Sequence, residues 1–313
     1  MPKTKLDKNR KSRTPRLLFT GFSMGVADLV PGVSGGTIAF LYGIYDELLF
    51  SIKQVSGTFL KLILKGQFKS AWKVLPLAFL VPLLSGIVIA IFSLSKLVTY
   101  LLDNHTVLIW SVFFGLVIGS VYVISKRITH WNLSRISLLV LGAVFTFLII
   151  GLSPIEGNAG ALAIFLTGMV AFCAMILPGI SGSLIMVILG QYKIVINAVS
   201  DRDFGLLIFL ALGGAVGLAL FSRVLIWLLK HYHAATIAFL IGMMIGSLRK
   251  VWPWQIEDQT VLPDLNLAIL LSVFAMVIGF TLVWYLERLG IAKEHDDIDD
   301  PKFTEQIKLT NNK

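Results

Sequence analysis

Two segments that lie 147 residues apart share the pattern Pro-Gly-x-Ser-Gly. They read Pro31-Gly32-Val33-Ser34-Gly35 and Pro178-Gly179-Ile180-Ser181-Gly182. Each lies near the middle of a long apolar stretch, 17–50 for the first and 161–199 for the second. Proline removes a helical hydrogen-bond donor, and glycine permits a tight turn. Each stretch is therefore predicted to break at this pattern.

Further matches extend outward from the two breaks. At the same offset of 147 residues, Gly43 matches Gly190 and Tyr45 matches Tyr192. Further along, the offset becomes 127 residues, and the matching positions there include Gly86 with Gly213, Ser95-Lys96 with Ser222-Arg223, and Gly115 with Gly242. The change of offset falls in a Lys-rich loop, 51–73, which the second half lacks. These matches predict two copies of one unit, over 17–153 and 161–288.

The composition indicates an integral membrane protein. Of 313 residues, 56% are hydrophobic and 14% charged, and mean hydropathy is +0.84. A soluble domain of this length needs more polar surface. Cys173 is the only cysteine, which excludes an intrachain disulfide and a cysteine metal cluster. No metal site or cofactor is predicted, and the net charge of +9 fits cytoplasmic Lys and Arg without a nucleic-acid partner.

The distribution of basic residues predicts the topology. The N-terminal tail 1–16 holds seven basic residues, and loop 51–73 is also Lys-rich. Both lie on the cytoplasmic side only if stretch 17–50 enters and leaves the membrane on the same face. Each half then crosses three times, so the second half is inverted relative to the first, and both termini are cytoplasmic. Arg249 and Lys250 are a mild exception to this scheme. The polar tail 293–313 follows the last span.

Each broken stretch is either two short full spans or a re-entrant hairpin. The length of its arms favours a hairpin, with the tips of the two hairpins meeting near the membrane midplane. Either arm has about 12–15 residues, or roughly 20 Å of helix, against a hydrocarbon core of about 30 Å. The predicted fold is therefore all-α: a polytopic membrane protein of two inverted repeats, each with a re-entrant helical hairpin plus three transmembrane helices.

The hairpin tips are the first candidate site. The prolines and first glycines form the breaks, namely Pro31, Gly32, Pro178 and Gly179. The second arms begin with small polar residues whose amides and hydroxyls suit an anionic substrate: Ser34, Gly35, Gly36, Thr37, Ser181, Gly182 and Ser183. The alternative is a kink required only for packing. Two inverted copies favour a substrate site at the repeat interface.

Three charged residues complete the candidate set. Lys96 and Arg223 end their apolar stretches at matching positions, and are expected either to bind substrate or to reach the headgroups as membrane anchors. Asp28 lies three residues before Pro31, and its counterpart is Met175. It is expected either to carry a coupling proton or to cap a helix arm, and capping is the favoured alternative.

The motifs resemble those of the bacterial polyprenyl-phosphate transporter family. The resemblance rests on Gly25-Val26-Ala27-Asp28-Leu29-Val30-Pro31-Gly32-Val33-Ser34-Gly35-Gly36-Thr37, on Gly43-Ile44-Tyr45, and on Ala174-Met175-Ile176-Leu177-Pro178-Gly179-Ile180-Ser181-Gly182-Ser183. It implies a flippase, not an enzyme, that returns undecaprenyl phosphate from the outer to the inner leaflet of the bacterial cytoplasmic membrane for cell-wall synthesis. Coupling to a proton or a sodium ion stays open.

Two other function classes fit less well. Undecaprenyl-pyrophosphate phosphatase has similar hairpins, but its motif continues with Arg-Ser and requires paired glutamates. Here Gly35 and Gly182 occupy the arginine positions, and neither hairpin has a Glu-x-x-x-Glu. A small-anion transporter requires a continuous polar lining. The other apolar stretches offer too few polar residues for one.

Overall fold

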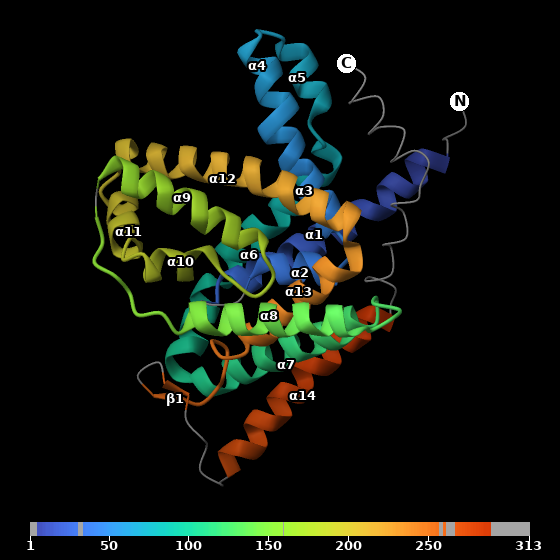
Figure 1. Ribbon diagram of the computed structural model, residues 1–313, viewed down its shortest axis with the longest axis vertical. Coiled ribbons are helices and arrows are strands. Elements are labelled where there is room, and N and C mark those ends of the chain that lie inside the picture. Colours follow the sequence, from blue (N-terminus) through green and yellow to red (C-terminus); the bar gives the residue numbers. More distant parts are fainter. Residues whose placement is uncertain (1–4, 31–33, 159, 257–258, 261–266, 289–313) are drawn as a thin grey trace.

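The computed structural model describes residues 5–30, 34–158, 160–256, 259–260 and 267–288 (Figure 1). The first half contains α1 (Lys5–Asp28), α2 (Gly35–Leu41), α3 (Tyr45–Gln54), the π-helix η1 (Val55–Phe59), α4 (Leu60–Leu64), α5 (Phe68–Val74), α6 (Leu77–Asn104), α7 (Thr106–Ser125) and α8 (Leu133–Ile150). The second contains α9 (Ala161–Ile176), α10 (Gly182–Ile188), α11 (Tyr192–Ser200), α12 (Phe204–His231), α13 (His233–Ser247) and α14 (Leu267–Arg288). A short ladder, β1 (Gln255–Ile256) with β2 (Gln259–Thr260), precedes α14.

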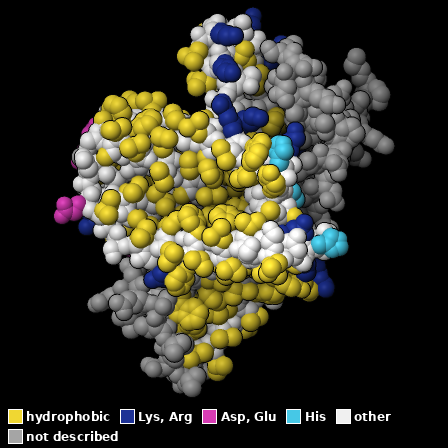
Figure 2. Space-filling view, viewed as in Figure 1, with side chains coloured by type: hydrophobic (Ala, Val, Ile, Leu, Met, Phe, Trp, Pro, Cys, Tyr) yellow, Lys and Arg dark blue, Asp and Glu magenta, His cyan; other side chains and the backbone are white. Residues whose placement is uncertain are grey.

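The fold is that of an all-α polytopic membrane protein, as predicted. In the described part of the chain, five helices are long and apolar enough to cross a bilayer: α6, α7, α8, α12 and α14. Their outward surfaces carry large apolar side chains, such as Phe92, 84% exposed, and Leu133, 82% exposed. Figure 2 shows such side chains spread widely over one face of the molecule. In water this surface would be unfavourable, so it is suited to contact with lipid.

Both predicted breaks are present. In the first half, α1 ends at Asp28 and α2 begins at Gly35; Pro31 and Gly32 lie outside the described residues. In the second half, α9 ends at Ile176, and the following turn contains Gly179 with φ +90°. That positive φ favours glycine.

The second arm of each hairpin differs from the prediction, because it is not one helix. Both α2 and α10 contain seven residues. They end in turns where Gly43 and Gly190 adopt φ of +72° and +67°. A residue in the left-handed region ends a helix and redirects the chain. The α10 and α11 axes therefore differ by 114°, which is typical of a re-entrant element or a broken span.

The segment predicted as loop 51–73 is also helical. From α3 the helix continues through η1 into α4, and a turn at Gly66, with φ +72°, leads into α5. The α4–α5 hairpin projects from the rest of the molecule at the top of Figure 1. It has no counterpart between α11 and α12, which accounts for the change of sequence offset.

Four helix pairs form most of the body: α1 with α6, α9 with α12, α7 with α14, and α8 with α13. Each pair crosses at glycines on which a Cβ would overlap a backbone carbonyl of the facing helix. These are Gly21, Gly86, Gly168, Gly213, Gly115, Gly279, Gly142 and Gly242. Small residues allow such close approach of helices in membranes.

Two of the four pairs join helices from different halves, which the sequence matches did not suggest. The helix α8 packs on α13 of the second half, while α14 packs on α7 of the first. Gly142 of α8 and Gly279 of α14 are both crossing glycines. They lie 137 residues apart, which is a third offset between the two halves. The halves thus exchange their last helices, and the inverted orientation stays a prediction.

The largely buried helix α13 supports the second tip. Ile237, Leu240, Ile241, Met243 and Met244 are at most 2% exposed. A Cβ on Gly179 would lie only 2.8 Å from the carbonyl oxygen of Met243. The turn after α9 is therefore held directly against α13.

Candidate functional site

The two hairpins contact each other at their tips, as predicted. The Ser34 hydroxyl donates to the carbonyl of Leu177 at 3.2 Å. The Thr37 hydroxyl accepts from the amide of Gly179 at 3.1 Å. Ser34 and Thr37 are each only 2% exposed. Two side chains of the first hairpin therefore bind backbone groups at the break of the second.

A tyrosine at the end of the first hairpin adds a third bond. The Tyr45 hydroxyl donates to the carbonyl of Ile176 at 3.2 Å, and Tyr45 is fully buried. Its counterpart, Tyr192, is 40% exposed. The joint between the hairpins is thus built from side chains of the first half and is not symmetric.

The first amides of α2 already have acceptors. The Gly35 amide donates to Asp28 Oδ1 at 2.7 Å, and the Gly36 amide donates to Ser34 Oγ at 3.1 Å. Asp28 therefore caps the second arm, which was the favoured of its two expected roles. Asp28 as a whole residue is exposed. An anion binding at the Gly35 amide would have to replace this carboxylate.

At the second tip, α10 is capped by its own serine. The Ser181 hydroxyl accepts from the Leu184 amide at 3.2 Å and lies 3.2 Å from the Ser183 hydroxyl. Ser183 is exposed, whereas Ser181 is buried. The equivalent of Asp28 here is Met175, so no carboxylate occupies this helix end. The second tip thus presents the Ser183 hydroxyl at the surface, with the apolar Met175 at the position that Asp28 has in the first half.

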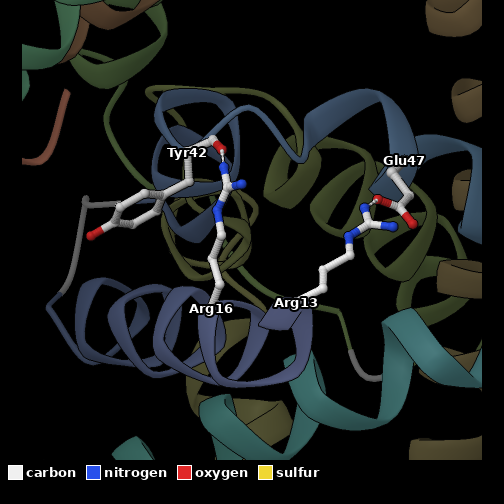
Figure 3. Close-up of polar contacts among 4 residues, drawn as sticks. All are labelled: Arg13, Arg16, Tyr42 and Glu47. Carbon is white, nitrogen blue, oxygen red and sulfur yellow. Dashed lines mark hydrogen bonds and ion pairs between the residues drawn. The ribbon is translucent and has the colours of Figure 1, made fainter. Parts of the chain in front are cut away.

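Two arginines hold the other end of α2, and sequence reasoning missed both. Arg127 donates to the carbonyls of Phe40 and Leu41, at 3.3 and 3.0 Å. Arg16 donates to the carbonyl of Tyr42 at 3.3 Å (Figure 3). Cations at a helix C-terminus stabilise its unpaired carbonyls.

The helix α1 makes a second contact with this hairpin. Arg13 forms an ion pair with Glu47 of α3, as Figure 3 shows. The Glu47 side chain is only 25% exposed. Together, Arg13 and Arg16 tie the basic segment of α1 to the turn between α2 and α3.

A lack of symmetry in the sequence could have revealed these residues. At the offsets that relate the halves, three charged residues that lie in or around the first hairpin correspond to uncharged ones in the second half: Asp28, Arg16 and Arg127 match Met175, Ala163 and Trp254. Charge is thus concentrated around the first hairpin.

Lys96 and Arg223 do not end their helices, contrary to the sequence prediction. They lie in α6, which continues to Asn104, and in α12, which continues to His231. Each is therefore about 12 Å from its helix end at 1.5 Å per residue. Both side chains are exposed, and neither has an ion-pair partner in the part of the chain that the structure describes.

Arg223 also lies beside the projecting hairpin. A Cβ on Gly57 of η1 would be 3.5 Å from Arg223 Nη2. This contact brings Arg223 next to the base of the α4–α5 hairpin.

Comparison with known proteins agrees with these features. The chain is 42% identical over 235 residues to a polyprenyl-phosphate transporter of Vibrio cholerae, covering 75% of this chain and 76% of the relative. It is 34% identical over 295 residues to a polyprenyl-phosphate transporter of Staphylococcus aureus, covering 88% and 97%. No solved structure matches the chain. The family model described as undecaprenyl phosphate translocase-like matches residues 24–269, and the chain belongs to this family.

Proposed function

We propose that this protein is a flippase that returns undecaprenyl phosphate from the outer to the inner leaflet of the bacterial cytoplasmic membrane. The observation that carries the proposal is the pair of broken helices whose tips meet inside an apolar helical body. Discontinuous helices that meet between two halves of a transporter commonly form its substrate site. The relatives are named transporters, and we propose transport without catalysis here too.

The phosphate headgroup is the difficult part of this substrate. A charged group in hydrocarbon alone is very costly, whereas the polyprenyl tail can remain in lipid. We assign the headgroup to the hairpin residues Ser34, Gly35, Gly36, Thr37, Ser181, Gly182 and Ser183. Non-helical backbone at membrane depth has to be buried in protein or to line a cavity, which agrees with this assignment.

Lys96 and Arg223 are proposed to hold the headgroup before and after it crosses. Both are exposed basic residues within long apolar helices. A cation partly withdrawn from water attracts phosphate several times more strongly than one in bulk solvent. In the inverted arrangement, Lys96 serves the outer leaflet and Arg223 the inner one.

Asp28 is proposed to couple transport to a proton. Its carboxylate accepts a hydrogen bond from the Gly35 amide at 2.7 Å, and at this position it would repel an incoming phosphate. Protonation removes that repulsion and weakens the carboxylate as an acceptor. The phosphate could then replace it at the tip. Because Asp28 is an exposed residue, we propose that a proton reaches its carboxylate from the protein surface.

The inverted topology can be tested by labelling. In a variant with Cys173 replaced, a single cysteine at Ser70 should react with an impermeant maleimide only from the cytoplasmic side. A single cysteine at Asn158 should react only from outside. Labelling of the Ser70 position from outside would overturn the re-entrant arrangement of the first hairpin.

The function itself can be tested with purified protein in liposomes. Fluorescent or radiolabelled undecaprenyl phosphate is placed in the outer leaflet only, and its outer-leaflet fraction is followed with a phosphate-binding lipopeptide. The protein should accelerate equilibration of this lipid, but should not accelerate entry of inorganic phosphate. Rapid inorganic phosphate entry without lipid movement would instead indicate a small-anion transporter. In cells, depletion should raise the surface-exposed undecaprenyl phosphate.

A further inference from the structure

The projecting α4–α5 hairpin exposes a row of large apolar side chains. Leu60 and Leu64 of α4 are 49% and 79% exposed, and Phe68 and Trp72 of α5 are 59% and 61% exposed. Within each helix the two residues are four apart, so they lie on the same face. Within the hairpin, the fully buried Ala71 packs inward beside this row.

Each of these apolar residues is followed directly by a lysine: Lys61, Lys65, Lys69 and Lys73. All four lysines are exposed. Within a helix, neighbouring residues are about 100° apart around the axis, so a basic line runs beside the apolar line. No acidic residue occurs between Glu47 and Asp103, so nothing on the hairpin offsets its positive charge. Figure 2 shows dark-blue basic side chains among yellow apolar ones on this projection.

This hairpin is unsuited both to crossing the bilayer and to remaining in water. The returning helix α5 has only seven residues before the chain enters α6, which is far too short for a span. Four exposed lysines exclude the hydrocarbon centre. Leu64 and Trp72 are too exposed to be favourable in water. An apolar line bordered by lysines is typical of helices that lie in the membrane interface.

We propose that the α4–α5 hairpin binds the anionic surface of the cytoplasmic leaflet. Leu60, Leu64, Phe68 and Trp72 enter the boundary between headgroups and acyl chains, and the adjacent lysines contact the phosphates of anionic lipids. The assignment to the cytoplasmic side rests on the topology proposed above. Because the base of the hairpin touches Arg223, the anionic lipid gathers where the proposed substrate is released.

The charge pattern of the α4–α5 hairpin favours a lipid surface, and not another protein, as its binding partner. Protein interfaces are depleted in lysine at their centres, whereas this row alternates lysine with apolar residues along its whole length. A leaflet rich in phosphatidylglycerol supplies a continuous negative surface that matches it.

The test measures immersion depth of the hairpin in the full-length protein. With Cys173 replaced by alanine, a spin label is attached to a single cysteine at Leu64 or, as the control at the turn, at Gln67. The proteins are reconstituted in phosphatidylcholine vesicles with and without phosphatidylglycerol. Power saturation then gives access to oxygen, which concentrates in acyl chains, and to a nickel chelate, which stays in water.

In anionic vesicles the label at Leu64 should gain oxygen access and lose nickel access relative to the label at Gln67. Replacing all four lysines with glutamine should abolish this difference in access between the two labels. Equal nickel access at both positions in anionic vesicles would overturn the proposal. Shielding from both reagents would overturn it in favour of a protein partner, and unchanged immersion without the lysines would refute their role. Depth is measured without transport, so a failed flippase assay leaves this result interpretable.

Discussion

The bond between Thr37 and Gly179 allows a sharp test of the contact between the hairpins. The Thr37 hydroxyl accepts from the Gly179 amide at 3.1 Å in a site where Thr37 is 2% exposed. In Thr37→Val a methyl group replaces the hydroxyl at nearly the same volume, so no cavity forms. The Gly179 amide is left buried without its acceptor, which costs about 1–3 kcal/mol.

This loss should lower the apparent unfolding midpoint. For a chain of this size, about 1–3 kcal/mol corresponds to a decrease of roughly 2–6 °C. The measurement is thermal unfolding of the purified protein in detergent micelles, followed by intrinsic fluorescence.

The control for this experiment is the same substitution at Thr281. That hydroxyl bonds to the carbonyl of Val277 within its own helix, and the residue is exposed on α14. Thr281→Val should therefore change stability by no more than about 0.5 kcal/mol. Equal midpoints for the Thr37 and Thr281 variants would refute the reasoning, since the bond between the hairpins would then contribute nothing measurable.

Three further predictions concern transport, measured as undecaprenyl phosphate flipping in liposomes with insertion checked separately. Lys96→Gln and Arg223→Gln should each stop flipping, Lys96→Arg should retain much of it, and Arg223→Lys should be weaker because lysine lacks a bidentate grip on phosphate; near-native rates in both glutamine variants would return the residues to membrane anchors. Asp28→Asn should flatten the pH dependence of flipping, whereas an unchanged profile would leave Asp28 as a helix cap only. Gly35→Val and Gly182→Val should abolish flipping, because their Cβ atoms would lie 2.6 Å from the Asp28 carboxylate and 2.8 Å from a backbone oxygen of α9; full activity in both would reduce the motifs to packing kinks.

Most of the helical framework could be predicted from the sequence. Long apolar stretches bounded by charge identify α6, α7, α8, α12 and α14, because a bilayer imposes helix and length together. The two breaks were predictable for a similar reason, since proline and glycine act locally on the backbone. Local chemistry was therefore a sufficient guide for these elements.

The second arms and the α4–α5 hairpin were harder to predict. Gly43 and Gly190 were recognised as matching residues, but a match does not indicate that the backbone there is left-handed. The lysines of 51–73 suggested a solvated loop, although their four-residue spacing is equally that of a helix. In both cases the sequence signal was present and had more than one structural interpretation.

The contacts around α2 could not be predicted from either half alone. Arg127 lies far along the chain from Phe40, and only the folded arrangement brings its guanidinium to the end of the helix. Likewise, the pairing of Ser34 and Thr37 with the second tip depends on how the halves dock. Sequence patterns identified the tip residues as candidates, but their partners are set by tertiary structure.

The exchange of last helices bears on how the protein is assembled during synthesis. The helix α7 is made early, yet its partner α14 is the last helix of the described chain. Until α14 inserts, Gly115 of α7 faces lipid or a temporary neighbour instead of the closely packed helix it will meet. The first half therefore cannot complete its packing on its own, and a chain that stops before α14 leaves the α14-facing side of α7 unpaired.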